Sequence, residues 1–122
     1  MTNKTIRMAQ QLFEGPFAID GWTPPARAAV FCILVPDARR EPPFRPVYVG
    51  ESANLAERAF PGAQHGRASW LDIADYDQGV YVAAHWMPQS TVGERKALER
   101  VLVQSCQPEC NEVFRGRSLV LQ

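Results

Sequence analysis

The chain contains one unbroken apolar run of eight residues, Ala28-Ala29-Val30-Phe31-Cys32-Ile33-Leu34-Val35, which is the longest in the sequence. A run of this length that is bounded by Pro36 and carries β-branched residues is typical of a buried strand. It is far too short to cross a bilayer as a helix, which takes about 20 apolar residues. The run therefore predicts a strand in the core of a globular domain.

Two further strands are predicted on the carboxyl-terminal side of this run. Residues 36–45 form a Pro-rich loop, and Pro46-Val47-Tyr48-Val49-Gly50 follows it as a second strand, so the two strands form an antiparallel hairpin. Residues 79–86 alternate as a third strand does, with Val80, Val82, Ala84 and Trp86 on one face and Tyr81, Ala83 and His85 on the other.

Helices are predicted at three places. The segment from Ser52 to Phe60 has a capping residue and an apolar face. A longer helix begins near Thr91, which has capping-box spacing to Glu94 and is followed by an apolar stripe at helical period. Met8, Leu12 and Phe13 fit one face of a short amino-terminal helix.

The order strand, strand, helix, strand, helix predicts an α+β fold. We expect a small three-stranded antiparallel sheet flanked by helices. Residues 1–25 form an N-terminal extension in this interpretation, and residues 26–122 form the domain.

Composition limits the class of protein. The chain has 122 residues, enough for one core, and 13 basic residues balance 13 acidic ones, so any basic surface must arise from uneven distribution. The positive charges near the N-terminus are not followed by an apolar stretch, so we expect a cytoplasmic protein with no membrane partner and with its three cysteines reduced.

Two motifs resemble those of a known family. Tyr48-Val49-Gly50, followed by Glu51-Ser52-Ala53-Asn54-Leu55-Ala56-Glu57-Arg58, resembles the second half of the GIY-YIG endonuclease signature, in which a helix with an essential Arg follows the strand. The segment from Glu99 through Pro108 to Asn111 resembles the family's C-terminal motif. The resemblance covers residues 28–111, in the expected order.

This resemblance implies a reaction and a set of residues. Members of the family hydrolyse phosphodiester bonds with one divalent cation, so Glu99 is expected to hold one Mg²⁺ or Mn²⁺ and Arg58 to contact the phosphate. Tyr48 is the second-motif tyrosine, and Asn111 braces the site. An Arg and a cation suit this chemistry because negative charge accumulates on the phosphate oxygens. We therefore expect these four residues to converge.

The first motif departs from the family. Where the family has Gly-Ile-Tyr, this chain has Ala29-Val30-Phe31, and a phenyl ring can neither accept nor donate the proton that a tyrosine hydroxyl carries. Phe31 therefore marks the family's tyrosine position without its chemistry. A nuclease-fold module that binds nucleic acid or a protein without cleaving is the alternative function.

The same residues also have ordinary structural explanations. Glu99 has basic neighbours on its helix and fits a surface ion pair. Tyr48 alternates with valines and fits simple packing on the sheet. Arg58 fits a solvated helix residue, and Asn111 fits a turn after Pro108.

The remaining candidates are auxiliary. Arg39 and Arg40, in the loop between the first two strands, are candidate phosphate contacts, because the arginine side chain suits bidentate contacts to phosphate. The large share of arginine among the basic residues of the chain also fits a GC-rich coding sequence. His65 follows the Arg58 segment as an auxiliary polar residue. Zinc is not expected, because the histidines, His65 and His85, lie far from Cys106 and Cys110 in the sequence. The expected partner is nucleic acid, in the first place DNA, with a protein partner as the alternative.

Overall fold

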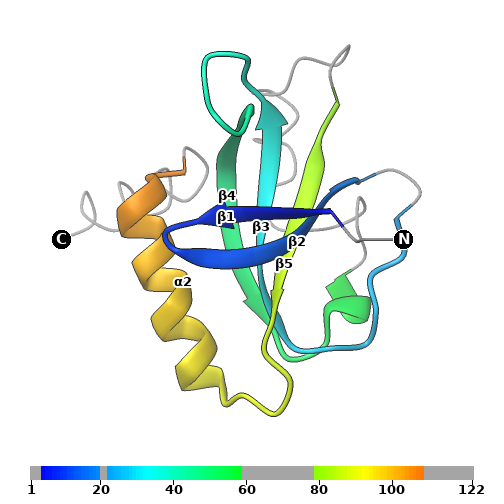
Figure 1. The fold of residues 1–122 in the computed structure, drawn as a ribbon. Coiled ribbons are helices and arrows are strands. Elements are labelled where there is room, and N and C mark those ends of the chain that lie inside the picture. Colours follow the sequence, from blue (N-terminus) through cyan, green and yellow to red (C-terminus); the bar gives the residue numbers. More distant parts are fainter. Residues whose placement is uncertain (1–3, 20–21, 59–78, 109–122) are drawn as a thin grey trace, which may run out of the picture.

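The structure is a computed structural model, and it describes residues 4–19, 22–58 and 79–108. These residues form one five-stranded antiparallel sheet in the order β1-β2-β5-β3-β4 (Figure 1). The strands are β1 (Thr5–Met8), β2 (Gln11–Ala18), β3 (Ala29–Pro36), β4 (Phe44–Ser52) and β5 (Tyr81–Trp86). The 3₁₀ helix η1 spans Leu55–Arg58, and the α-helix α2 spans Val92–Cys106.

The predicted three-stranded sheet flanked by helices is wrong. The described part of the chain is mostly β, with five strands and a single α-helix. The amino-terminal segment accounts for much of the difference, because Met8, Leu12 and Phe13 lie in the hairpin of β1 and β2 and not in a helix. Ala9 and Gln10 both adopt positive φ between these strands, as the tight turns of hairpins require.

The three strands predicted from residues 28–86 are confirmed, with small shifts at their ends. β3 lies between β4 and β5, and every residue of β3 before Pro36 is buried. β3 is covered on both faces of the sheet, so the residues that point to either face are apolar and the run is continuous. A strand with one exposed face would alternate apolar and polar residues instead.

Two apolar clusters lie on the two faces of the sheet. The first-face cluster takes alternate residues of β3 and includes Ala29, Phe31, Ile33, Val47, Tyr48, Leu55, Val82 and Ala84. The second-face cluster takes the other residues of β3 and includes Ile6, Phe13, Val30, Cys32, Leu34, Val49, Ala83 and Leu102. Because β3 contributes residues to both clusters, it is the central strand of the core.

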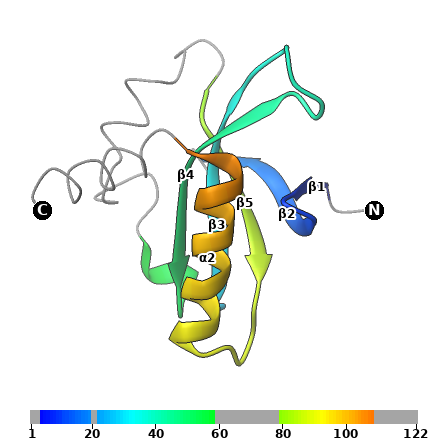
Figure 2. The ribbon, with the colours of Figure 1, turned by 90° about the vertical axis from the view of Figure 1, so that its left-hand side faces the viewer.

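The second face is covered by α2 and by the β1–β2 hairpin. Figures 1 and 2 show α2 running beside β4, with the hairpin folded in front of the sheet. The register of β2 against β5 shifts between Glu14 and Phe17, and this irregularity bends β2. Gly15 lies at the bend with φ +119°, and a Cβ there would lie 2.8 Å from the Val82 carbonyl oxygen. A glycine is required here on both counts.

Candidate functional site

The two motif strands pair with each other in the structure. β3 and β4 are antiparallel neighbours in which Phe31 pairs with Gly50 and Ile33 with Tyr48. The register shifts after this pair, so that Leu34 pairs with Pro46 and Val47 is an extra residue on β4. As a result both Val47 and Tyr48 belong to the first-face cluster. The ring centroids of Phe31 and Tyr48 are 6.1 Å apart and the rings are tilted by 43°.

Gly50 lies beneath these two rings. A Cβ at this position would lie 2.6 Å from Cζ of Phe31, 3.0 Å from its Cε1 and 3.1 Å from Cε2 of Tyr48. The tip of the Phe31 ring therefore reaches across the backbone of β4, which is an edge strand of the sheet. A glycine is required at this position of the motif because a side chain would occupy the space that the two rings fill.

The polar turn after Gly50 brings η1 to the first face. The Ser52 hydroxyl accepts a hydrogen bond from the Asn54 backbone N–H, and the Asn54 side chain accepts one from Ala56 N–H, both at 3.1 Å. Leu55 is fully buried in the first-face cluster, and its N–H donates to the Arg27 carbonyl. Arg58 is the last residue of η1 and therefore follows this anchored turn directly. Ser52 was predicted to cap this helix, but the residue that caps its start is Asn54.

The helix predicted from Thr91 is confirmed as α2. The Thr91 hydroxyl accepts from Glu94 N–H at 3.1 Å, and the Glu94 carboxylate accepts from Thr91 N–H at 2.8 Å, which completes the capping box. Arg95, Glu99, Leu102 and Cys106 follow one another at helical spacing and therefore share one stripe of α2. Arg95 and Leu102 are buried, and Glu99 is half-buried between them.

Arg95 fixes this stripe to β4. Its Nε donates to the Glu51 carboxylate at 2.9 Å, and its Nη1 donates to the carbonyl and hydroxyl oxygens of Ser90, both at 2.9 Å. The side chain is only 6% exposed, and Lys96 lies 3.6 Å from the second oxygen of Glu51. The ion pair between Arg95 and Glu51 was not predicted from the sequence. The available signal was a charged residue on the apolar stripe of α2, together with an acid directly after Gly50.

Glu99 and Tyr48 approach β4 from different sides. Tyr48 packs in the first-face cluster, whereas the apolar residues of α2 pack on the second face. The two faces meet at the outer edge of β4, since no further strand pairs there in the described residues. Tyr48 and the helix that carries Glu99 thus lie on opposite faces of the sheet, and the expected convergence of Tyr48, Arg58 and Glu99 stays a prediction. It would have to occur at the outer edge of β4 beside Gly50. We call this place the β4 edge site.

The other predicted residues divide into three groups. His65 and Asn111 lie outside the described residues, as does Cys110. Arg39 donates from Nε to Asp37 at 3.2 Å, and this hydrogen bond lowers the pKa of the Asp37 carboxyl, whereas Arg40 lines a separate pocket. His85 Nδ1 lies 2.9 Å from the Leu12 carbonyl oxygen, where the imidazole has a structural role on the hairpin.

The ligand set for a divalent cation is small. Within residues 4–19, 22–58 and 79–108, no group of three or more His, Cys, Asp or Glu residues gathers in a way that could hold a metal ion. Mg²⁺, however, keeps several waters and commonly takes only one or two protein carboxylates, completing its shell with substrate phosphates. A single half-buried carboxylate such as Glu99 fits that requirement.

Comparison with known protein families, curated proteins and solved structures gives no match for this chain. In the described part of the chain no helix combines the length and the apolar character needed to cross a membrane.

Proposed function

We propose that the chain is a divalent-metal-dependent endonuclease that hydrolyses phosphodiester bonds in DNA. The observation that supports the proposal is that β4 contacts both the Phe31–Tyr48 ring pair and the stripe of α2 that includes Glu99. The Phe31 and Tyr48 rings meet above Gly50 on one side of an edge strand, and the α2 stripe that includes Glu99 is fixed to the same strand through Arg95 and Glu51. The resemblance of both motifs to GIY-YIG endonucleases supports the same function.

Each residue has a defined role in this proposal. Glu99 holds the cation through a carboxylate oxygen, and Arg58 contacts the phosphate, where a guanidinium donates two parallel hydrogen bonds. Tyr48 is buried, with 8% of its surface exposed, and in this proposal its hydroxyl orients the attacking water or accepts its proton. Mg²⁺ or Mn²⁺, when bound, supplies positive charge to the phosphate oxygens and lowers the pKa of a bound water.

A matched pair of variants on α2 tests the proposal. Glu99→Gln removes the metal-binding carboxylate, while Glu94→Gln removes another carboxylate from α2 and retains a side chain that completes the capping box. We expect Mn²⁺-dependent nicking of supercoiled plasmid and cleavage of single-stranded DNA by the wild type and by Glu94→Gln. Glu99→Gln is expected to reduce the rate by at least about 10²-fold.

Equal activity of the two variants would contradict the proposal, because it would show that the cleavage comes from a contaminating nuclease or from another site. Absence of cleavage in the wild type and in every variant, with all chains folded, would contradict it as well.

One observation favours a second function, a module that binds nucleic acid without cleaving it. Phe31 is fully buried and has no hydroxyl, so the first motif offers no proton acceptor. Phe31→Tyr, assayed in the same experiment, separates the two functions. The new hydroxyl extends from Cζ, the ring atom that lies 2.6 Å from a Cβ built on Gly50. A nuclease gains rate, by up to the roughly 10²- to 10⁴-fold that general-base assistance supplies. A binding module retains DNA in a salt-dependent manner and stays inactive.

A further inference from the structure

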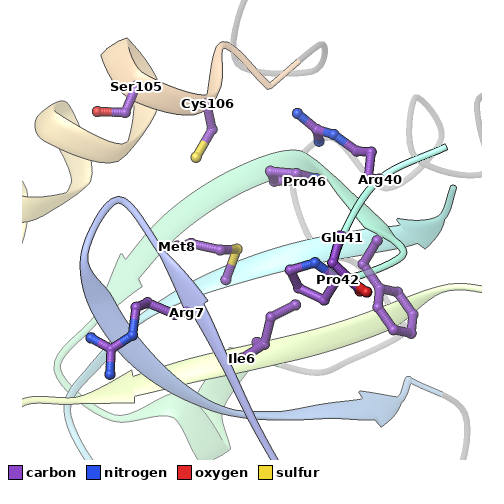
Figure 3. Close-up of a pocket in the computed structure, with 10 residues that line it drawn as sticks. Ile6, Arg7, Met8, Arg40, Glu41, Pro42, Pro46, Ser105 and Cys106 are labelled. Carbon is purple, nitrogen blue, oxygen red and sulfur yellow. The ribbon is translucent and has the colours of Figure 1, made fainter.

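A pocket of about 200 Å³ lies at the end of the molecule where β1, the β3–β4 loop and the last turn of α2 meet (Figure 3). No residue of the β4 edge site lines it. Its volume is below the roughly 300–1,000 Å³ of pockets that take a whole drug-sized ligand. It therefore has room for one flat ring system, with the rest of the ligand outside.

The floor and walls of the pocket are apolar. Ile6, Met8, Phe44 and Pro46 line it, and Figure 3 shows Met8 and the Cys106 sulfur directed into the space from different elements. Ile6 and Pro46 are buried and Met8 is half-buried, so the floor is part of the packed core. A thioether and a proline ring suit the face of a planar ring.

The rim of the pocket carries a net positive charge. Arg7 and Arg40 contribute two positive charges and Glu41 one negative charge. Among the salt bridges of the described residues, neither Arg7 nor Arg40 takes part, whereas their neighbour Arg39 is held by Asp37. The positive charge of Arg40 also opposes the rise that burial causes in the pKa of the Cys106 thiol, which places this guanidinium near the pocket wall.

The rim also provides both kinds of hydrogen-bonding group. The guanidinium groups donate, the Glu41 carboxylate accepts, and the Ser105 hydroxyl does both. A fatty acid would use the guanidinium groups alone and would be repelled by Glu41. A nucleobase has a flat apolar face, a polar edge with donors and acceptors, and a phosphate attached one sugar away.

We propose that this pocket takes one unpaired nucleotide of a single-stranded nucleic acid, with the base on the apolar floor and its phosphate against Arg40. The inference rests on the proposed function, because it extends the DNA strand from the β4 edge site along α2. Cys106 lies seven residues after Glu99 on this helix, which is roughly 10 Å at 1.5 Å per residue. That distance is at most about three base steps at the 3.4 Å rise of stacked DNA, and fewer for an extended strand. The pocket would therefore select a base a few positions from the cleaved bond.

Two arginines of the same loop provide the test. Binding of a fluorescein-labelled single-stranded 12-mer is measured by anisotropy in EDTA, so that no cleavage takes part, for the wild type, Arg40→Gln and Arg39→Gln. We expect Arg40→Gln to weaken binding about fivefold or more and to lower the salt slope by about one, because one phosphate contact and its base are lost. The sequence also offers Arg39 as a phosphate contact, but its guanidinium pairs with Asp37 and does not line the pocket. The pocket therefore predicts that Arg39→Gln changes binding less than twofold.

The thiol of Cys106 gives a second readout that needs no substitution. Because it lines the pocket, saturating oligonucleotide should slow its alkylation by maleimide several-fold, with the modified peptide identified by mass spectrometry. Duplex DNA of the same sequence should protect it less.

Equal loss of binding in the two arginine variants, equal binding of duplex and single strand, or unprotected Cys106 at saturation would each overturn the inference. Arg40-dependent binding by a chain that never cleaves DNA would support the pocket and contradict only the nuclease.

Discussion

At the scale of single residues, Gly50 explains most about the candidate site. The rings of Phe31 and Tyr48 pack against its backbone. A Cβ added at Gly50 would lie 2.6 Å from Cζ of Phe31, which is shorter than real Cβ contacts. The glycine of the motif could be recognised in the sequence, but the packing that requires a glycine at this position could not. This packing depends on the register that pairs Phe31 with Gly50, which is a property of two strands and not of one motif.

Gly50→Ala should destabilise the fold by about 1–3 kcal/mol, since both neighbouring rings are buried and an added methyl overpacks the site. Urea denaturation followed by tryptophan fluorescence measures the change. Gly93→Ala is the control, because the nearest atom to its added Cβ is the Thr91 hydroxyl at 3.8 Å and α2 gains roughly 0.5–1 kcal/mol from the change.

Combining Gly50→Ala with Phe31→Leu should cost less than the sum of the two single changes, because the smaller side chain frees the space. Additive costs, or an unchanged midpoint for Gly50→Ala, would contradict the packing described here.

At the scale of elements, the sequence predicted the strands and the helix whose signals are local. The apolar run of β3, the alternation of β5 and the capping box of α2 each reside in a few neighbouring residues. The β1–β2 hairpin was missed because Met8, Leu12 and Phe13 match a helical face as well as two strands, and Ala9-Gln10 lacks the Asn-Gly or Asp-Gly signal of a tight turn. Pairing with β5, some 70 residues away, decided the outcome.

The Arg95–Glu51 pair joins α2 to β4, and its loss should be costly. Arg95→Met removes the guanidinium that pairs with the largely buried Glu51 carboxylate and bonds to Ser90, so we expect a loss of about 3 kcal/mol in the free energy of unfolding. Arg100→Ala, an exposed residue of the same helix, should stay within about 0.5 kcal/mol.

Adding Glu51→Gln to Arg95→Met should recover part of the loss, because it removes the largely buried negative charge that has lost its guanidinium partner. Denaturation midpoints of the single and double variants measure this coupling. A double variant less stable than Arg95→Met alone would show that the cost does not come from the Glu51 carboxylate that has lost its guanidinium partner.

At the scale of the whole molecule, one sheet holds two separate surfaces along α2. Glu99 lies near the middle of α2, and the pocket lies at the carboxyl end of the helix, beside Arg40 of the β3–β4 loop. The chain is neutral overall, yet Arg7 and Arg40 gather at one end. Net charge therefore could not predict a surface for nucleic acid, because the fold alone brings residues 7 and 40 together.

In the proposed function, the outer edge of β4 holds a catalytic cation through Glu99. Anomalous diffraction from crystals soaked with Mn²⁺ and a non-hydrolysable oligonucleotide tests it most directly. We expect one Mn²⁺ bound directly to a Glu99 carboxylate oxygen at the outer edge of β4 beside Gly50, and no such peak in Glu99→Gln crystals. Crystals with ordered oligonucleotide but no Mn²⁺ at Glu99, or with Mn²⁺ bound only elsewhere, would contradict it.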